Sequence, residues 1–458
     1  MAHVVASTAV LVLLGLIALS SATPRKLELP DLSKLAPESI YFFPLADEKC
    51  GEGNPMFYGI ITPKKIDTTK KFWIESMGGA ICFNEASCND KEFNVWLDLL
   101  KTMKRYMHGL PPSMGTVETL YPVLTSGQPF PISMIKPFDI AYFPSSPGDP
   151  LEGEVGFYYP SCTADAGLGN HKVTYNSSQV IHHSGGASYR LLLEAIQQAY
   201  TDIERMTLIG ASGSAVSRLA WAPTVADMFP TAEVHVLADS AMHVLPGTDV
   251  FRYFWNEVQW SPNPDGRHDL AQLYAPDLTS LPMFDWRSPS AISDMLRQYG
   301  GRIKVMYLGC NHDEIVTTDR QALAEYAQLT VPTSPEAIAE GMWAFLQNLT
   351  RDAPAGSVFS YISEGTCHHE TRENFADSEA INASDPNDVG PKKFTEAFLK
   401  GEFPAAGNIW CCNKKPSAPA TAETGGTDVS LAVSRMPSLI AVGFAAVWAS
   451  FAAIQIIA

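Results

Sequence analysis

The segment 208–214 (Leu-Ile-Gly-Ala-Ser-Gly-Ser) offers a serine whose hydroxyl is placed to act as a nucleophile. It follows a short apolar run and precedes a helical pattern, and small residues flank Ser212 on both sides. A sharp turn between strand and helix exposes a serine hydroxyl, and the N–H of Gly213 would then face a developing oxyanion. The helix N-terminus adds a favourable dipole. The alternative is a structural turn with an idle serine.

A serine nucleophile needs an imidazole to take its proton and a carboxylate to orient that imidazole. Downstream of Ser212, one apolar run ends beside Asp313 and Glu314, and the next ends beside His368 and His369. The order serine, acid, histidine is that of α/β-hydrolases, and an acid after a parallel strand lies at the functional edge of the sheet. A metal site is the competing interpretation, but the zinc-binding spacing His-Glu-x-x-His is absent from the sequence.

The elements that must position these groups alternate between strands and helices. Short apolar runs predict strands at 72–76, 139–143, 206–209, 234–237, 303–308 and 358–362. Helical patterns lie at 186–200, 214–228 and 335–349, the last beginning with Ser334 as N-cap and Pro335 in its first turn. This alternation predicts an α/β fold with a mainly parallel sheet, helices on both faces and long loop insertions.

The two ends of the chain have the composition of processing signals. Residues 1–22 combine an apolar run with small residues before the expected cleavage point, which indicates a secretory signal peptide. The α/β domain is expected at 40–413, and a flexible stalk at 414–427. Residues 428–458 contain a polar spacer and an apolar tail after small residues. This layout indicates a GPI-anchor signal, with a C-terminal membrane helix as the alternative.

The charge, the cysteines and the glycosylation sequons indicate which partners to expect and in which compartment the protein folds. The formal net charge is −17, so nucleic acid is not an expected partner. Eight cysteines form an even set, which in an exported protein would mostly pair. Cys82 and Cys88 are close enough for a local loop, and the sequence leaves the other pairings open. Asn176, Asn348 and Asn382 each open an Asn-x-Ser/Thr sequon, so glycans are expected.

A second oxyanion donor is expected from the loop after the strand at 72–76. That loop, 78–88, begins Gly-Gly-Ala-Ile-Cys-Phe-Asn and ends in a second cysteine, and it resembles the corresponding segment of the pectin acetylesterase/Notum family. Further segments are similar to blocks of that family, in the same order. They are 159–165 (Tyr-Pro-Ser-Cys-Thr-Ala-Asp), 210–213, 237–240 (Leu-Ala-Asp-Ser), 312–314 and 367–370.

The resemblance implies a serine carboxylesterase of α/β-hydrolase type that needs no metal or other cofactor. It implies Ser212 as nucleophile, Asp313 as orienting acid and His369 as base, with His368 as the alternative base. The oxyanion donors it implies are the backbone N–H groups of Gly79, Ala80 and Gly213. Two departures, Ala80 where the family has Trp and Ser214 where it has Gly, indicate an altered acyl pocket.

The sequence therefore predicts a secreted serine esterase on the extracellular face of the cell surface, with a membrane attachment through its C-terminal anchor. The expected substrate is an O-acyl, foremost O-acetyl, ester on a polysaccharide. A deacylase of lipid-modified proteins is the first alternative. A catalytically inactive surface binding protein on a hydrolase scaffold is the alternative from another class.

Overall fold

The computed structural model describes most of the region from residue 27 to residue 410. The described ranges are 27–65, 70–76, 88, 117–131, 149–169, 171–175, 179–241, 289–318, 334–368, 390–403 and 407–410. All of them belong to one compact unit, Met1–Asn413. The signal peptide, stalk and tail expected at the ends of the chain lie outside the described residues. The strand expected at 139–143 also lies outside them.

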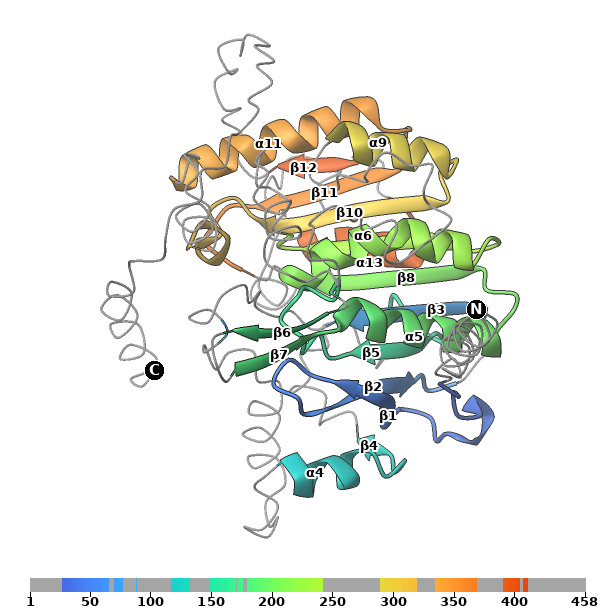
Figure 1. The fold of residues 1–458 in the computed structure, drawn as a ribbon. Helices are drawn as coiled ribbons and strands as arrows, with labels where there is room; N and C mark the ends of the chain where they lie inside the picture. The colour runs from blue at the N-terminus through green and yellow to red at the C-terminus, as the bar shows by residue number, and fades with distance from the viewer. Residues whose placement is uncertain are drawn as a thin grey trace, which may run out of the picture. The chain divides into compact units, whose positions relative to one another are not determined.

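The centre of the domain is a sheet in which ten described strands run in the order β12-β11-β10-β9-β8-β3-β5-β2-β1-β4 (Figure 1). Neighbours from β12 to β5 pair in parallel, whereas β5–β2, β2–β1 and β1–β4 are antiparallel. The bounds are β1 Ser39–Lys49, β2 Pro55–Thr62, β3 Lys71–Ser76, β4 Phe130–Pro131, β5 Val155–Tyr159, β8 Arg205–Ala211, β9 Glu233–Asp239, β10 Ile303–Cys310, β11 Val358–Ser363 and β12 Asn408–Trp410.

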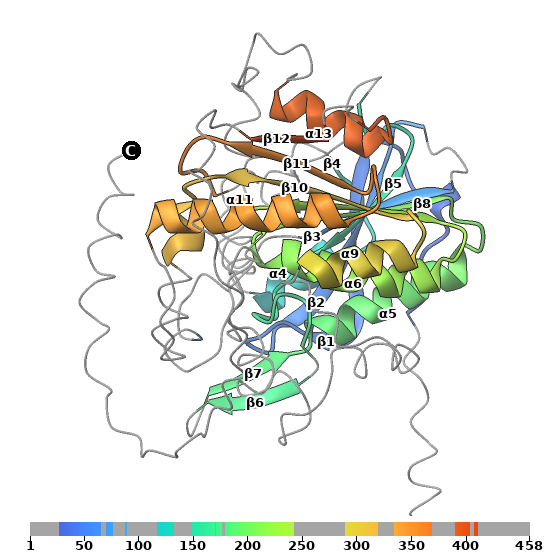
Figure 2. The same cartoon turned by 90° about the horizontal axis from the view of Figure 1, so that it is seen from above.

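Helices cover both faces of this sheet. Figure 2 shows α5 (Gly185–Ala199), α6 (Gly213–Met228), α9 (Pro289–Gln298) and α11 (Pro335–Asp352) on one face and α13 (Pro391–Lys400) on the other. The short helix α4 (Val117–Leu124) lies next to β4, and the hairpin β6–β7 (His171–Tyr175, Gln179–His183) extends from the main body (Figure 1). A one-turn 3₁₀ helix, η1 (Leu32–Lys34), precedes β1.

The predicted α/β architecture is confirmed. Five predicted strands correspond to β3, β8, β9, β10 and β11, and the three predicted helices to α5, α6 and α11. Every residue of β8 and β11 is buried, as expected for strands of a parallel sheet that is covered by helices on both faces. Helix α11 begins as expected, with the Ser334 hydroxyl accepting a hydrogen bond from the Ala337 N–H at 3.2 Å.

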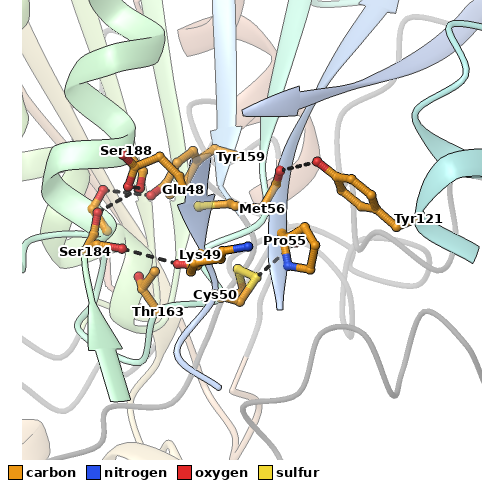
Figure 3. Close-up of a disulfide and its surroundings, with 12 residues drawn as sticks. Glu48, Lys49, Cys50, Pro55, Met56, Tyr121, Tyr159, Thr163, Ser184 and Ser188 are labelled. Atoms are coloured by element: carbon orange, nitrogen blue, oxygen red, sulfur yellow. Dashed lines mark hydrogen bonds between the residues drawn. A yellow bond between two sulfur atoms is a disulfide. The ribbon is translucent and has the colours of Figure 1, made fainter. Parts of the chain in front are cut away.

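Disulfides join segments that are distant in the sequence, in agreement with the expectation that the cysteines pair. Cys50 is bonded to Cys162, and Cys310 to Cys367. Cys88 is also in a disulfide, while Cys82, its expected partner, lies outside the described residues. Figure 3 shows the surroundings of Cys50, where the Ser184 hydroxyl donates to the Lys49 carbonyl at 3.2 Å. The first disulfide thus fixes the end of β1 to the loop after β5.

The amino-terminal edge of the parallel strands carries a buried ion pair. Arg205, at the start of β8, donates to the Glu154 carboxylate and also to the Lys400 carbonyl at 2.9 Å. Burial raises the pKa of Glu154, and the charge of Arg205 opposes this shift. On β9, the His235 ring is buried against Phe398 and Phe403 and contacts Glu233. Burial lowers the pKa of His235.

In the part of the chain that the structure describes, no helix has the length and apolar character needed to cross a membrane.

Candidate active site

Ser212 stands at the turn between β8 and α6, at the carboxyl edge of the sheet. Its backbone has φ 54° and ψ −128°, a conformation that L-residues rarely adopt and that is typical of strained functional turns. The turn is tight because α6 folds back on β8. A Cβ added to Gly210 would lie 2.6 Å from the Ser214 carbonyl oxygen, so only glycine fits there. The segment therefore forms the sharp strand–turn–helix that the sequence predicts.

Ser214 holds this turn together. Its Oγ accepts a hydrogen bond from the Ala211 N–H at 2.9 Å and lies 2.8 Å from the Ala211 carbonyl oxygen. The same Oγ lies 3.0 Å from the carbonyl oxygen of Ser76, the last residue of β3. Its single hydroxyl hydrogen can serve either carbonyl. Ser214 thus connects the turn to the strand that leads into the glycine-rich segment at 78–88.

A buried cation supports α6 behind the turn. The Arg218 guanidinium is fully buried and lies 3.6 Å from the centroid of the Tyr189 ring, in cation–π geometry. It also donates to the Ser217 hydroxyl, which in turn donates to the Ser214 carbonyl at 2.9 Å. Burial lowers the pKa of Arg218. The first turns of α6 are therefore held by a series of hydrogen bonds that runs from the Ser214 carbonyl through Ser217 to the buried Arg218.

The loop after β5 is organised around a fully buried carboxylate, that of Asp165. Its two oxygens accept hydrogen bonds from the Thr163 hydroxyl at 2.7 Å and from backbone N–H groups. These N–H groups belong to Gly167, Gly169 and Gly185, at 2.9, 3.0 and 2.8 Å. Because Gly185 opens α5, Asp165 fixes this loop to the start of that helix.

The acid and a histidine meet at the ends of the next strands along the same edge. His368 Nδ1 lies 2.9 Å from Asp313 Oδ2 and 3.0 Å from Oδ1. Asp313 is 5% exposed, and it also accepts a hydrogen bond from the Val316 N–H at 2.9 Å. The structure therefore brings together Asp313 and His368, which the sequence analysis gave as the alternative base. His369, Gly79 and Ala80 lie outside the described residues, whereas Gly213 is the first residue of α6.

Backbone hydrogen bonds connect these groups across the edge of the sheet. The Ser212 N–H donates to the Asp239 carbonyl at 2.8 Å, and the Ser240 N–H to the Leu308 carbonyl at 2.9 Å. Beyond β10, the Asn311 N–H donates to the Ser363 carbonyl at 3.0 Å. The segments that carry Ser212, Asp313 and His368 are therefore parts of one hydrogen-bonded edge and not independent loops.

The sequence analysis assigned no role to Asn311. Its Oδ1 accepts a hydrogen bond from the Gly365 N–H at 3.0 Å, and so it connects the acid-bearing loop to the histidine-bearing loop. A usable signal was its place three residues after the end of the strand predicted at 303–308 and two residues before Asp313. A polar residue there faces the neighbouring parallel strand, which ends before Gly365 and His368.

The strand order, the sharp turn at Ser212 and the helices on both faces of the sheet are those of an α/β-hydrolase-like domain. No protein-family model matches the chain, and no curated protein matches it. Among solved structures, the Wnt deacylase Notum from Drosophila is similar, at 14% sequence identity and a TM-score of 0.45. That match covers 80% of this chain and 94% of the Notum chain.

Proposed function

We propose that the protein is a serine carboxylesterase in which Ser212 is the nucleophile, His368 the base and Asp313 the group that orients His368. The observation that carries the proposal is the contact of 2.9 Å between Asp313 and His368 at the edge of the sheet where Ser212 occupies its strained turn. The contact uses Nδ1, so the imidazole presents Nε2 for proton transfer. Choosing His368 over His369 rests on this contact.

The reaction follows from these roles. As the Ser212 hydroxyl attacks the ester carbonyl, its proton passes to His368, and the resulting oxyanion accepts hydrogen bonds from the Gly213 N–H and from Gly79 and Ala80. Collapse of this intermediate breaks the bond to the alcohol, which leaves with the proton from His368. A water molecule then gives a proton to His368 and attacks the acyl-enzyme, which releases the acid and restores Ser212.

The substrate proposed first is an O-acetyl ester on a polysaccharide, because the sequence resembles pectin acetylesterases along most of the domain. The disulfides support folding in an oxidising compartment, as secretion requires. Attachment to the outer face of the membrane through a GPI anchor completes the proposal, based on the small residues, spacer and apolar tail of the sequence.

Hydrolysis of p-nitrophenyl esters from acetyl to palmitoyl tests the chemistry and the acyl length together. We expect Ser212→Ala to lower kcat/KM by about 10⁴-fold or more, and His368→Ala to act comparably. His369→Ala is the matched control, since it removes a neighbouring imidazole, and it is expected to retain activity. Preference for acetyl would support the polysaccharide substrate, and preference for long chains a lipid-modified protein. Folded wild type without Ser212-dependent hydrolysis would favour the inactive binding protein.

A further inference from the structure

The loops that carry Asp313 and His368 are joined by more contacts than two neighbouring strands provide. β10 and β11 pair in parallel up to Cys310 opposite Ser363. Beyond this point three hydrogen bonds continue the junction. Two run from backbone to backbone, Asn311 N–H to Ser363 carbonyl and His312 N–H to Gly365 carbonyl, both at 3.0 Å. The third is the contact of the Asn311 side chain with the Gly365 N–H.

A disulfide also joins the two loops. Cys310 ends β10, three residues before Asp313, and its partner Cys367 directly precedes His368. Both half-cystines are buried, as is Asn311. Each of the two groups is therefore anchored within three residues by a covalent bond to the loop that carries the other.

Packing from the α11 side leaves this region incompletely filled. A cavity of about 30 Å³ lies between the acid-bearing loop and α11, and its lining includes Asn311, Asp313, Met342 and Leu346. This volume corresponds to about one water molecule. Close packing normally holds core side chains in place, so its interruption here gives more weight to the hydrogen bond from the Val316 N–H to Asp313 and to the bonds between the two loops.

We propose that Asn311 and the Cys310–Cys367 disulfide are positioning elements that hold Asp313 against His368 in the geometry that proton transfer requires. This inference rests on the proposed function. The physical reason is that a displacement of about 1 Å in a catalytic group costs about 10²-fold in rate, although it leaves ground-state binding of substrate nearly unchanged. Loss of either positioning element should therefore lower kcat and leave KM nearly unchanged.

The chain offers a matched control for each element. The Cys50–Cys162 disulfide closes a longer loop, with a sequence separation of 112 against 57, so its removal should cost at least as much stability. It joins the end of β1 to the loop after β5, whereas Asp313 and His368 follow β10 and β11, on the other side of β8 in the sheet order. For Asn311 the control is Asn408 on β12, whose Oδ1 accepts a hydrogen bond from the Ser360 hydroxyl of β11 at 2.8 Å. Asn408 is exposed whereas Asn311 is buried, so the comparison of kcat is made together with the thermal melts of both variants. Both controls remove the same chemical groups, away from the acid–histidine pair.

The experiment measures kcat and KM for ester hydrolysis, with thermal melts to show that each variant is folded at the assay temperature. We expect a fall in kcat of about 10- to 100-fold, with KM within about twofold, for Asn311→Ala and for the double variant Cys310→Ala/Cys367→Ala. Asn408→Ala and Cys50→Ala/Cys162→Ala should keep the wild-type kcat. Asn311→Ala keeps all disulfides, so it provides the test even if the double cysteine variant does not fold.

The outcomes separate the two proposals. If wild type shows Ser212-dependent hydrolysis and Asn311→Ala has an unchanged kcat, the positioning proposal alone is overturned. Equal losses of kcat in the test variants and their controls overturn it as well, because the effect would then follow stability. If wild type shows no Ser212-dependent hydrolysis, both the proposed function and the positioning proposal that rests on it are overturned.

Discussion

Replacing Ser214 with alanine should separate the geometry of the nucleophile turn from the stability of the domain. The Ser214 hydroxyl accepts from the Ala211 N–H and donates within the turn or to Ser76 at the end of β3. Ser214 is 1% exposed and Ala211 7% exposed, so water cannot replace the lost contacts. The substitution leaves one buried N–H without an acceptor.

The expected cost follows from this count. An unsatisfied buried donor costs about 1–3 kcal/mol, so the free energy of unfolding should fall by about that amount. The effect on catalysis should be larger than this loss of stability implies, because the turn that sets Ser212 relative to β3 loosens. We expect kcat to fall about tenfold or more with little change in KM.

Urea unfolding and p-nitrophenyl ester kinetics on the same preparations measure both effects. Ser293→Ala is the control, because Ser293 is also a buried serine near the start of a helix, where its hydroxyl donates to the Pro289 carbonyl at 2.7 Å. It should lose stability and keep kcat. A Ser214→Ala protein that is destabilised but hydrolyses esters at the wild-type kcat would refute the proposed link between this hydroxyl and the turn.

Three further perturbations test the rest of the domain. Glu154→Ala leaves the buried Arg205 guanidinium without its carboxylate, so urea unfolding should show a loss of about 3–5 kcal/mol, most of it regained when Arg205→Met is added; no recovery in the double variant would contradict the buried-charge explanation. Asp165→Asn turns amide hydrogens toward backbone N–H groups and should cost about 3 kcal/mol, whereas an unchanged urea midpoint would argue against the buried four-donor site. His235 has its pKa lowered by burial in the folded protein, so the unfolded chain binds the extra proton first and stability falls as the pH drops below about 6.5. Comparing urea unfolding at high and low pH should show a smaller loss in His235→Phe than in wild type, and equal losses would assign the pH dependence to other groups.

The sequence was sufficient for the parts of the fold that depend on local pattern. Strands β8 to β11 are short apolar runs before turns, and the start of α11 has a serine cap followed by proline, so periodicity and capping predict them. The antiparallel strands β1 and β2 and the hairpin β6–β7 were not predicted. Their pairing depends on long-range partners, and the apolar residues of β1 and β2 do not alternate regularly.

For the candidate site, chain order and strand ends left Asp313 or Glu314 as the acid and His368 or His369 as the base, and the family resemblance favoured Asp313 and His369. His368 and His369 have the same side chain, and only the path of the backbone decides which of them faces Asp313. That path is set by the segment from Gly365 to Cys367, which precedes His368. The pairing of Cys310 with Cys367 was likewise open, since eight cysteines allow many connectivities. The adjacency of β10 and β11 in the sheet decides it.

The order of strands in the sheet has a consequence for how the chain folds during synthesis. β3 lies between β5 and β8 in the sheet, but both strands follow it in the sequence. Lys71 therefore has no partner on the β8 side until Arg205 has been synthesised. Both edges of β3 are unpaired until β5 is synthesised, and the edge that later pairs with β8 stays open to other chains until β8 follows. Nascent chains that end before β8 are therefore the species most prone to aggregate. A chaperone that binds extended apolar segments would act on them. Truncated chains that end between β3 and β8 should therefore be insoluble.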